Sequence, residues 1–235
     1  MATILCDLDG TLLVKRRPDP PGMVSPKRAA INRALADICD TPAVDFVPSM
    51  EHGFTDWMIA ERAVRVHRPG FDLDGPSWQA VVARAEAVFM PGPPGGAGIY
   101  RRLDGVPEVL HALRDAGHRL GLVTGNVSFF ALYKLREAGI DQALFEGPAA
   151  FSDHGRERAH ILRTALARDP DGPAVVLGDT VHDRVGAVAV GLPFLGTGAM
   201  GLRRDQVELD DGAVAAWLPD LGDPTRVVAA VAGLL

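Results

Sequence analysis

Two carboxylates, Asp7 and Asp9, are separated by a single leucine in the segment Asp7-Leu8-Asp9-Gly10-Thr11. The apolar residues Ile4-Leu5-Cys6 stand directly before them and are typical of a buried strand. A polar turn would account for Asp9-Gly10, but it would not account for a carboxylate at Asp7, next to the buried run. In an open parallel sheet, ligands bind beyond the carboxyl ends of the strands. The pair therefore predicts a functional site at the end of this strand.

Two further apolar runs end in polar groups of the same kind. The second is followed by Thr124-Gly125-Asn126, whose hydroxyl and amides could hold an anion at the start of a helix. The third is followed by a segment with carboxylates at Asp179 and Asp183. Each signal alone is also typical of a turn or a helix cap. In neighbouring parallel strands they would meet at one edge of the sheet, which would bring together Asp7, Asp9, Thr124, Asp179 and Asp183.

A cluster of this kind needs a cation, because several buried carboxylates cannot stay ionised side by side without one. The candidate ligands are all oxygens, and no histidine or cysteine accompanies them at a useful spacing. Sites built from oxygen alone select hard cations. The cluster therefore predicts a Mg²⁺ site, with Asp7, Asp9, Asp179 and Asp183 as the candidate metal residues.

These residues need a scaffold in which strands and helices alternate. Short apolar runs at 2–6, 120–123 and 174–177 are each typical of a strand buried on both faces of a parallel sheet. A helical pattern precedes the second run, and a polar-edged helix marked by Phe130, Lys134 and Glu137 follows it. The helix after the third run carries an apolar stripe formed by Val181, Val185, Val188, Ala189 and Leu192. The alternation predicts an α/β fold with a doubly wound parallel sheet.

Between residues 20 and 90 the pattern changes, because no strong strand run appears there. Helical stretches are predicted at 27–39, 54–66 and 77–90. Segments rich in Pro and Gly at 18–22 and 91–96 mark hinge linkers at the two ends. The sequence therefore predicts a core domain, 1–17 with 97–235, and a small helical cap domain inserted at 18–96.

The segment Asp7-Leu8-Asp9-Gly10-Thr11, with Gly178-Asp179 and Asp183 at this spacing, resembles the haloacid-dehalogenase-like (HAD) hydrolase superfamily. The resemblance covers residues 1–17 and 97–200, with a helical insert where many members place a cap. Within the superfamily, the chain is similar to phosphatases with a helical cap, such as the phosphoglycolate phosphatase-like members. The resemblance implies a Rossmann-like core, a Mg²⁺ cofactor and a small phosphorylated metabolite as substrate.

The resemblance also implies a role for each residue of the cluster. Asp7 would be the nucleophile that forms an aspartyl-phosphate, and Asp9 would be the general acid and base. Asp7 and Asp179 would bind the metal by their side chains and Asp9 by its backbone carbonyl, with Asp183 close by. Thr124, with the backbone of Gly125 and Asn126, would hold the phosphoryl oxygens.

The chain departs from the superfamily in its third motif, which usually presents a lysine before a helix. No lysine follows Lys134, but Arg156 and Arg158 stand at the matching place. Arg158 lies four residues before Leu162 and seven before Ala165, so it shares the inward face of the predicted helix. We therefore expect Arg158, as a catalytic and substrate-binding residue, to point toward Asp7. Arg156 is expected on the polar face.

Several functions remain to be weighed. Dehalogenases and phosphonate hydrolases of the superfamily lack the second aspartate, and the latter use a cap lysine, for which Lys27 is the one candidate. A sugar phosphomutase keeps Asp9 and remains the alternative to a phosphatase. A non-catalytic binding protein on this scaffold would have lost Asp7 or Asp179, and both are present. In the cap, Thr55 or Asp56 is expected as a helix cap, with substrate contact by His52, Thr55 or Asp56 as the other possibility.

Composition excludes other classes. The net charge is −6 and no long basic run occurs, so no nucleic-acid partner is expected. No apolar run reaches the roughly 18 residues that cross a bilayer, and no secretory leader is visible. Two cysteines cannot form a disulfide framework. The sequence therefore predicts a cytoplasmic protein without a membrane partner, and it leaves the oligomeric state open.

Overall fold

The computed structural model describes residues 1–16, 25–41, 53–89, 98–170 and 172–235. Its main sheet is parallel throughout, in the order β5-β4-β1-β6-β7-β8. The strands of this sheet are β1 (Thr3–Cys6), β4 (Arg119–Val123), β5 (Ala149–Ala150), β6 (Ala174–Gly178), β7 (Phe194–Thr197) and β8 (Ala215–Leu218). The three predicted apolar runs are β1, β4 and β6, and they lie side by side in the middle of the sheet.

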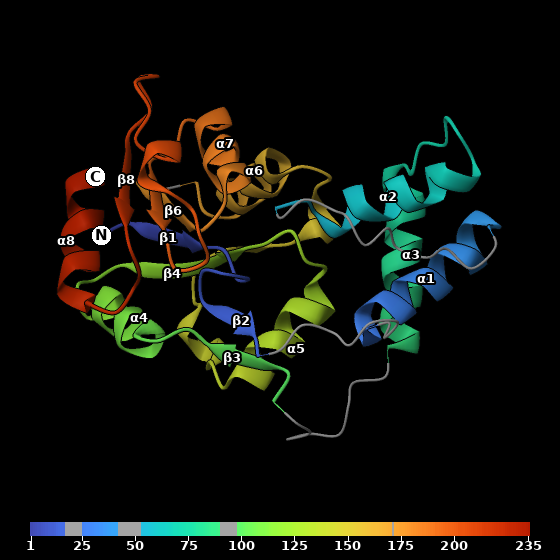
Figure 1. Ribbon diagram of the computed structural model, residues 1–235, viewed down its shortest axis with the longest axis horizontal. Helices are drawn as coiled ribbons and strands as arrows, with labels where there is room; N and C mark the ends of the chain where they lie inside the picture. The colour runs from blue at the N-terminus through green and yellow to red at the C-terminus, as the bar shows by residue number, and fades with distance from the viewer. Residues whose placement is uncertain (17–24, 42–52, 90–97, 171) are drawn as a thin grey trace.

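Helices cover both faces of the sheet, so the predicted doubly wound α/β fold is confirmed (Figure 1). In Figure 1, α6 and α7 lie above the sheet and α4 and α5 below it, while α8 packs against α4. The bounds of these helices are α4 (Val106–Asp115), α5 (Ser128–Ala138), α6 (Arg158–Arg168), α7 (Val181–Ala189) and α8 (Pro224–Leu234). Single 3₁₀ turns occur at η1 (Gln142–Leu144), η2 (Ser152–His154) and η3 (Arg204–Gln206).

In its described residues, the insert forms three helices that lie beyond the carboxyl ends of the strands (Figure 1). They are α1 (Pro26–Cys39), α2 (Asp56–His67) and α3 (Gly75–Val88), each within two residues of its predicted start and end. Ser25, Thr55 and Asp74 cap their N-termini by accepting backbone hydrogen bonds. The segments of chain that enter and leave the insert pair as two antiparallel strands, β2 (Leu13–Lys15) and β3 (Tyr100–Arg102). The linkers at 18–22 and 91–96 lie outside the described residues, so the boundary of a cap domain at 18–96 stays a prediction.

The apolar stripe predicted on the helix after β6 is not its buried face. Val181, Val185 and Val188 on α7 are 41%, 56% and 41% exposed. The buried face instead carries Asp183, Arg184, Gly186 and Ala187. A Cβ atom at Gly186 would lie 2.7 Å from Cβ of Arg158, so α7 packs closely on α6 through this glycine. The helix turns Asp183 toward the end of β6 and Arg184 toward Val207 and Asp211, and its valines are left at the surface.

Within the described part of the chain, no helix combines the length and the apolar character needed to cross a bilayer.

Candidate active site

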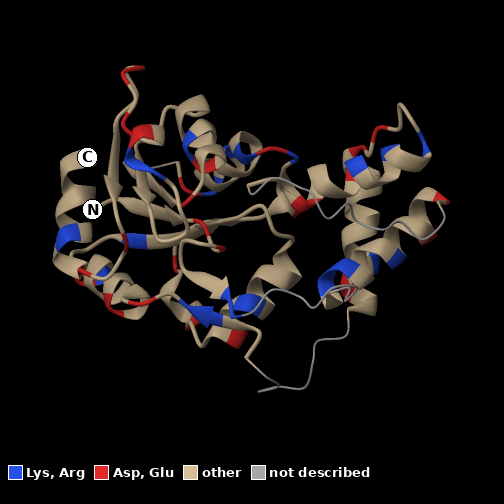
Figure 2. Cartoon of the chain, viewed as in Figure 1, with Lys and Arg blue, Asp and Glu red and all other residues tan. Residues whose placement is uncertain are grey.

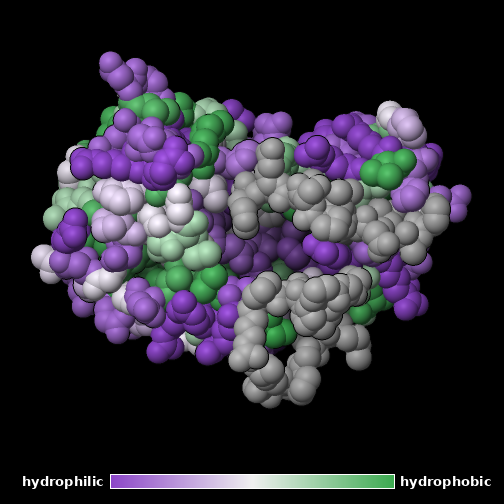
Figure 3. All heavy atoms as spheres, viewed as in Figure 1, coloured by the Kyte–Doolittle hydropathy of each residue, from purple (hydrophilic) through white to green (hydrophobic). Residues whose placement is uncertain are grey.

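The carboxyl ends of β1, β4 and β6 meet at one edge of the sheet and face α1–α3 across a cleft of about 850 Å³. The cleft lies between the two parts of the molecule as a hydrophilic hollow (Figure 3). Acidic residues lie at the strand ends, and basic residues lie on α5 and at the start of α1 (Figure 2). The cleft is lined by residues from both parts, including Asp7, Asp9, Thr124, Asn126, Arg158 and Asp179. The structure therefore brings the side chains predicted from three strand ends to one site.

Three of the predicted carboxylates form a compact cluster. Asp7, Asp179 and Asp183 each offer an oxygen, and these oxygens lie within 4.8 Å of one another. Asp7 is 2% exposed, and Thr11 donates a hydrogen bond of 3.1 Å to Oδ1 of Asp179. Gly10 allows this approach, because its φ of +82° suits glycine and a Cβ atom there would collide with the Asp179 carboxylate.

Burial perturbs two members of this cluster strongly. It raises the pKa of Asp7 to about 7, because the charge of Arg158 only partly offsets the lost hydration and the repulsion from Asp183 and Asp9. Burial also raises the pKa of Asp179 to about 8, and repulsion from Asp7 and Asp183 adds to the shift. With its carboxylates ionised, the cluster would hold more negative charge than its surroundings balance. This is the condition under which carboxylates bind a divalent cation.

Arg158 is the one protein cation that contacts this cluster among the described residues. It is the first residue of α6, and its Nη1 lies 2.8 Å from Oδ1 of Asp7. Its Nε lies 3.2 Å from Oδ1 of Asp183, close enough for an ion pair although the angle does not make a hydrogen bond. Burial would lower the pKa of Arg158, but the charges of Asp183 and Asp7 outweigh it and raise the pKa. The guanidinium therefore stays charged beside Asp7.

Asp183 is fixed by the start of α7. Its Oδ2 accepts hydrogen bonds from the backbone N–H of Thr180 at 3.1 Å and from the Thr180 hydroxyl at 2.6 Å. Its own backbone N–H returns a bond to that hydroxyl at 3.2 Å, which completes a capping box. Asp183 is therefore both a helix cap and a neighbour of Asp7, so the two interpretations of this carboxylate do not compete.

Asp9 lies apart from the acidic cluster and has a basic environment. Both of its carboxylate oxygens bind Nζ of Lys134, at 2.7 and 2.5 Å, and Oδ2 accepts a bond of 2.6 Å from the Asn126 amide. Desolvation would raise the pKa of Asp9, but the charge of Lys134 and these hydrogen bonds outweigh it and lower the pKa. The side chain of Asp9 is thus held as a carboxylate, turned toward α5.

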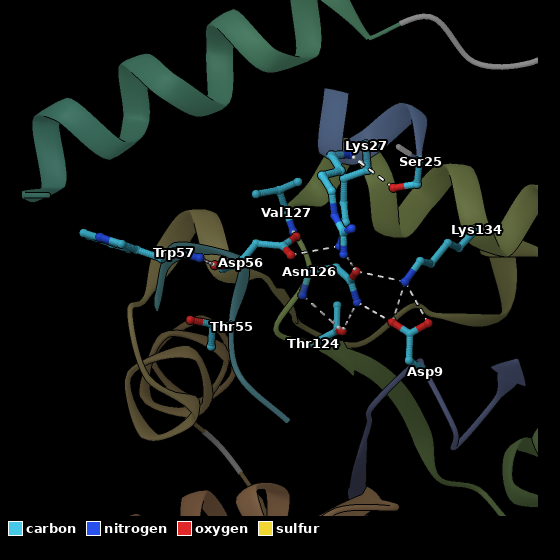
Figure 4. Close-up of polar contacts among 12 residues, drawn as sticks. Asp9, Ser25, Lys27, Thr55, Asp56, Trp57, Thr124, Asn126, Val127 and Lys134 are labelled. Atoms are coloured by element: carbon cyan, nitrogen blue, oxygen red, sulfur yellow. Dashed lines mark hydrogen bonds and ion pairs between the residues drawn. The ribbon is translucent and has the colours of Figure 1, made fainter. Parts of the chain in front are cut away.

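Asn126 is the centre of a polar network between the two parts of the molecule (Figure 4). Its Oδ1 accepts from Lys134 at 2.9 Å and from Lys27 of α1 at 3.1 Å, and its amide nitrogen donates to Thr124 Oγ1 at 3.0 Å. Lys27 also pairs with Asp56 of α2 at 2.8 Å. Thr124 and Asn126 therefore serve as structural members of the site as well as candidate ligands for a phosphoryl group.

The start of α2 packs directly on the predicted phosphate-binding turn. The backbone N–H of Asp56 donates to the Gly125 carbonyl at 2.7 Å, and its carboxylate accepts from the Val127 N–H at 2.9 Å. Thr55 is the helix cap, as expected, whereas Asp56 is buried and joins the two parts of the molecule. His52, the third residue considered there, lies outside the described residues.

A second set of contacts ties α2 and α3 to the segment that carries Arg158. The Trp57 N–H donates to the Ser152 hydroxyl at 3.0 Å, and the Trp78 indole donates to the Ser152 carbonyl at 2.9 Å. Arg156 pairs with the buried Glu61 and with Asp72. Arg156 thus contacts the insert, whereas Arg158, two residues on, contacts Asp7.

Two basic residues of the cleft, Lys134 and Lys27, make contacts that the sequence did not predict. Lys134 was expected on the polar edge of its helix, yet its side chain is 6% exposed and faces Asp9. Its spacing from Phe130 and Ala138, both buried on α5, was the signal that placed it on the inward face. Lys27 could be recognised as a cap lysine, but its contact with Asn126 joins residues 99 positions apart, and no local pattern predicts such a contact.

Comparison with known proteins agrees with this geometry. A family model described as haloacid dehalogenase-like hydrolase matches residues 1–191. A 5'-nucleotidase of Pseudomonas aeruginosa is 29% identical over 202 residues, which cover 83% of this chain and 81% of that protein. A phosphoglycolate phosphatase of Rhodospirillum rubrum is 27% identical over 198 residues, which cover 82% and 77%. The crystal structure of a hydrolase from Pseudomonas syringae is similar with a TM-score of 0.60 and 16% identity, covering 97% of this chain and 98% of that one, and shows the same fold.

Proposed function

Because this chain belongs to the haloacid dehalogenase-like hydrolases, we propose that it is a Mg²⁺-dependent phosphatase that acts on a small phosphorylated metabolite through an aspartyl-phosphate on Asp7. The observation that carries the proposal is the environment of Asp7. This carboxylate is buried at a strand end, with Arg158 at 2.8 Å and two further carboxylates near enough to share a cation with it. A nucleophilic carboxylate needs such a setting, since it must meet a phosphate of its own charge sign.

The residues present fit a hard divalent cation. Asp7, Asp179 and Asp183 would hold it, because their oxygens lie within 4.8 Å of one another and burial raises the pKa of two of them. Bound there, Mg²⁺ would neutralise charge on the phosphate and on Asp7. The backbone carbonyl of Asp9 remains a fourth candidate ligand from the family resemblance.

In the first step, an oxygen of Asp7 attacks phosphorus while the bond from phosphorus to the leaving-group oxygen breaks. Arg158 holds a phosphoryl oxygen and Thr124, with the backbone N–H groups beside it, holds another. Asp9, which the contacts of the free site hold as a carboxylate, must take up a proton for this step, and it gives that proton to the leaving oxygen. The alcohol departs, and the phosphoryl group remains on Asp7.

In the second step, Asp9 acts in the opposite sense. As a carboxylate it takes a proton from a water molecule, whose oxygen attacks phosphorus as the bond to Asp7 breaks. Inorganic phosphate leaves, Asp7 is regenerated as a carboxylate, and Asp9 is again protonated. Lys134 and Asn126 orient the carboxylate of Asp9 for this task.

The test is release of phosphate from p-nitrophenyl phosphate with Mg²⁺, after chelation with EDTA, and after Mg²⁺ is restored. We expect activity that is lost on chelation and recovered on addition of the metal, and that Asp7→Asn lacks. Hydroxylamine trapping followed by mass spectrometry should give a hydroxamate at Asp7 during turnover. Full activity after exhaustive chelation, or normal turnover in Asp7→Asn, would overturn the proposal.

A phosphomutase of the same superfamily is the alternative, and the same enzyme preparation distinguishes the two. A phosphatase releases inorganic phosphate from a hexose phosphate, whereas a mutase converts it to an isomer. The relatives named as a phosphoglycolate phosphatase and a 5'-nucleotidase favour hydrolysis of a phosphate monoester. The two free and buried cysteines, Cys6 and Cys39, accord with a reducing compartment such as the cytoplasm.

A further inference from the structure

The wall of the cleft beside Asp9 carries an ammonium pair, formed by Lys27 of α1 and Lys134 of α5. Resting on the proposed phosphatase activity, we propose that this pair recognises a second anionic group on the leaving-group part of the substrate. The substrates would then be phosphate monoesters whose alcohol also carries a carboxylate or a second phosphate. Phosphate esters of uncharged alcohols, nucleosides among them, would be poor substrates for this enzyme.

The two ammonium groups are immediate neighbours. Both donate to the same atom, Oδ1 of Asn126, at 3.1 Å from Lys27 and 2.9 Å from Lys134 (Figure 4). Both also lie over the ring of Phe130, at 4.8 and 4.9 Å from its centroid. Two like charges brought this close repel each other. Asp9 and Asp56 each pair with one of them and offset that repulsion, so the two ammonium groups can stay together at the wall of the cleft.

Lys27 still has a hydrogen bond to give. An ammonium group has three donors, and Lys134 uses its own on the two oxygens of Asp9 and on Asn126. Lys27 uses one on Asp56 and one on Asn126, and its third N–H has no acceptor among the described residues. Its side chain is 20% exposed and lines the cleft. The free donor is therefore available to a ligand in the cleft.

The position of Lys27 is fixed before any ligand arrives. Its partner Asp56 is buried and is anchored to the core by bonds to the Gly125 carbonyl and the Val127 N–H. A cation held in place by a buried carboxylate loses little freedom when it binds an anion. Lys27 is thus suited to select a ligand as well as to attract one.

The two sides of the cleft differ in a way that sets the orientation of the substrate. Arg158 and the acidic cluster define the place of the transferred phosphate in the proposed function, and Asp9 defines the place of the leaving oxygen. Beyond Asp9, the ammonium pair and also Lys15 and Arg28 line the cleft. Apolar side chains also line the cleft, among them Phe54, Val181, Met200 and Leu202. A second anion on the leaving group would therefore lie against Lys27.

The test compares kcat/KM for matched esters: propyl phosphate, 2-carboxyethyl phosphate and propane-1,3-diol bisphosphate, with adenosine 5'-monophosphate as a large uncharged alcohol. We expect either charged ester to exceed propyl phosphate by about ten- to a hundredfold, the range for a hydrogen bond to a charged group. Whichever charged ester is preferred identifies the anion. Lys27→Met should bring the ratio of charged to uncharged ester close to one, and Lys27→Arg should keep most of it.

The control is Arg84→Gln, which removes a cap charge whose side chain pairs with Asp37 outside the cleft. It should leave both the ratio and the rates unchanged. Equal kcat/KM for charged and uncharged esters in the native protein, a preference for adenosine 5'-monophosphate, or an unchanged ratio in Lys27→Met would each overturn the inference. Turnover of p-nitrophenyl phosphate in those cases would show that the phosphatase proposal stands, whereas no turnover of any ester would show that it has failed.

Discussion

Asp7 and Asp9 stand two residues apart at the end of one strand, yet their surroundings are opposite. Asp7 is 2% exposed and lies beside two other carboxylates, and burial raises the pKa of Asp7. The side chain of Asp9 is 43% exposed and binds Lys134 with both oxygens, which lowers the pKa of Asp9. Two identical side chains thus receive different chemistry from the groups that face them. Asp7 lies in an acidic region suited to a cation, and Asp9 lies in a basic region suited to an acid–base group and an anionic alcohol.

Neutralising each carboxylate in turn tests whether Asp7 and Asp9 have separate roles, and it should give the largest effects. Asp7→Asn should abolish turnover of all esters, because no nucleophile remains. Asp9→Asn should reduce kcat by about 10²–10⁴-fold, because only proton transfer is lost. Its loss should be larger for alkyl than for p-nitrophenyl phosphate, since the aryl oxygen leaves without a proton. Steady-state rates on both esters measure this, and equal losses in the two variants would contradict separate roles.

The next effect separates Arg156, which precedes α6, from Arg158, the first residue of that helix. Arg158→Ala should lower kcat by about 10²–10³-fold, the cost of losing one donor to a developing charge. Arg158→Lys should keep part of the activity. Arg156→Ala should have a much smaller effect on kcat, since Arg156 pairs with Glu61 and Asp72 of the insert. Small and equal losses in both alanine variants would remove Arg158 from the proposed mechanism.

A smaller effect is expected from the residue that orients Asp9. Lys134→Met should lower kcat by about tenfold, roughly the weight of one hydrogen bond to a charged group. Alkyl phosphates should be affected more than aryl phosphates, because the change acts through Asp9. Arg136→Met, on the exposed side of the same helix, is the matched control and should change neither rate. A loss of the same size on both ester types would indicate damage to packing instead.

The smallest effect concerns stability without metal. Asp7 and Asp179 have pKa values of about 7 and about 8 in the folded chain, raised from 3.8. The folded state then binds more protons than the unfolded state between these values, so stability falls as pH rises through that window. The thermal midpoint in EDTA should fall from pH 5 to pH 8 by about 2–4 °C for each kcal/mol involved.

Two comparisons test whether the acidic cluster causes that fall. Mg²⁺ should raise the midpoint more at pH 8 than at pH 5, because the carboxylates must lose their protons to bind it. Asp179→Asn should flatten the dependence on pH, since it removes one of the raised groups. Thermal scans by circular dichroism measure both. If the thermal midpoint of the native chain in EDTA rises with pH over this window, the acidic cluster is not the cause of the pH dependence.

Local patterns were sufficient for the sheet centre and for the helices of the insert. The runs that became β1, β4 and β6 are apolar on both faces, and buried parallel strands leave that trace in sequence. The other strands were not predicted. Of these, β2, β3 and β5 have only two or three residues, which is too short for a periodicity to show. The runs of β7 and β8 have four residues each and were also missed. Arg158 could be predicted beside Asp7 because the family resemblance implied a basic residue before this helix, and helical spacing then favoured Arg158 over Arg156.

The valines of α7 show where local pattern misleads. Their spacing is helical and apolar, which predicts a helix correctly, but it does not say which side packs. Asp183 and Gly186 decided that, the first through its bonds to Thr180 and the second through its contact with α6. The contacts of Asp183 and Gly186 thus set the orientation of α7, and this orientation leaves the apolar valines exposed.

The residues that could act follow from the sequence, because they stand in motifs at the ends of predicted strands. Parallel strands bring their terminal side chains to a common edge of the sheet, whatever path the chain takes between them. Only the tertiary structure decided what those residues face. Asp9 meets Lys134, which is 125 positions away, and Asn126 meets Lys27 at a separation of 99. Such pairs arise from the packing of α1 and α5 around the cleft. No periodicity records them, since the electrostatic field at a carboxylate depends on distance in space and not on distance along the chain.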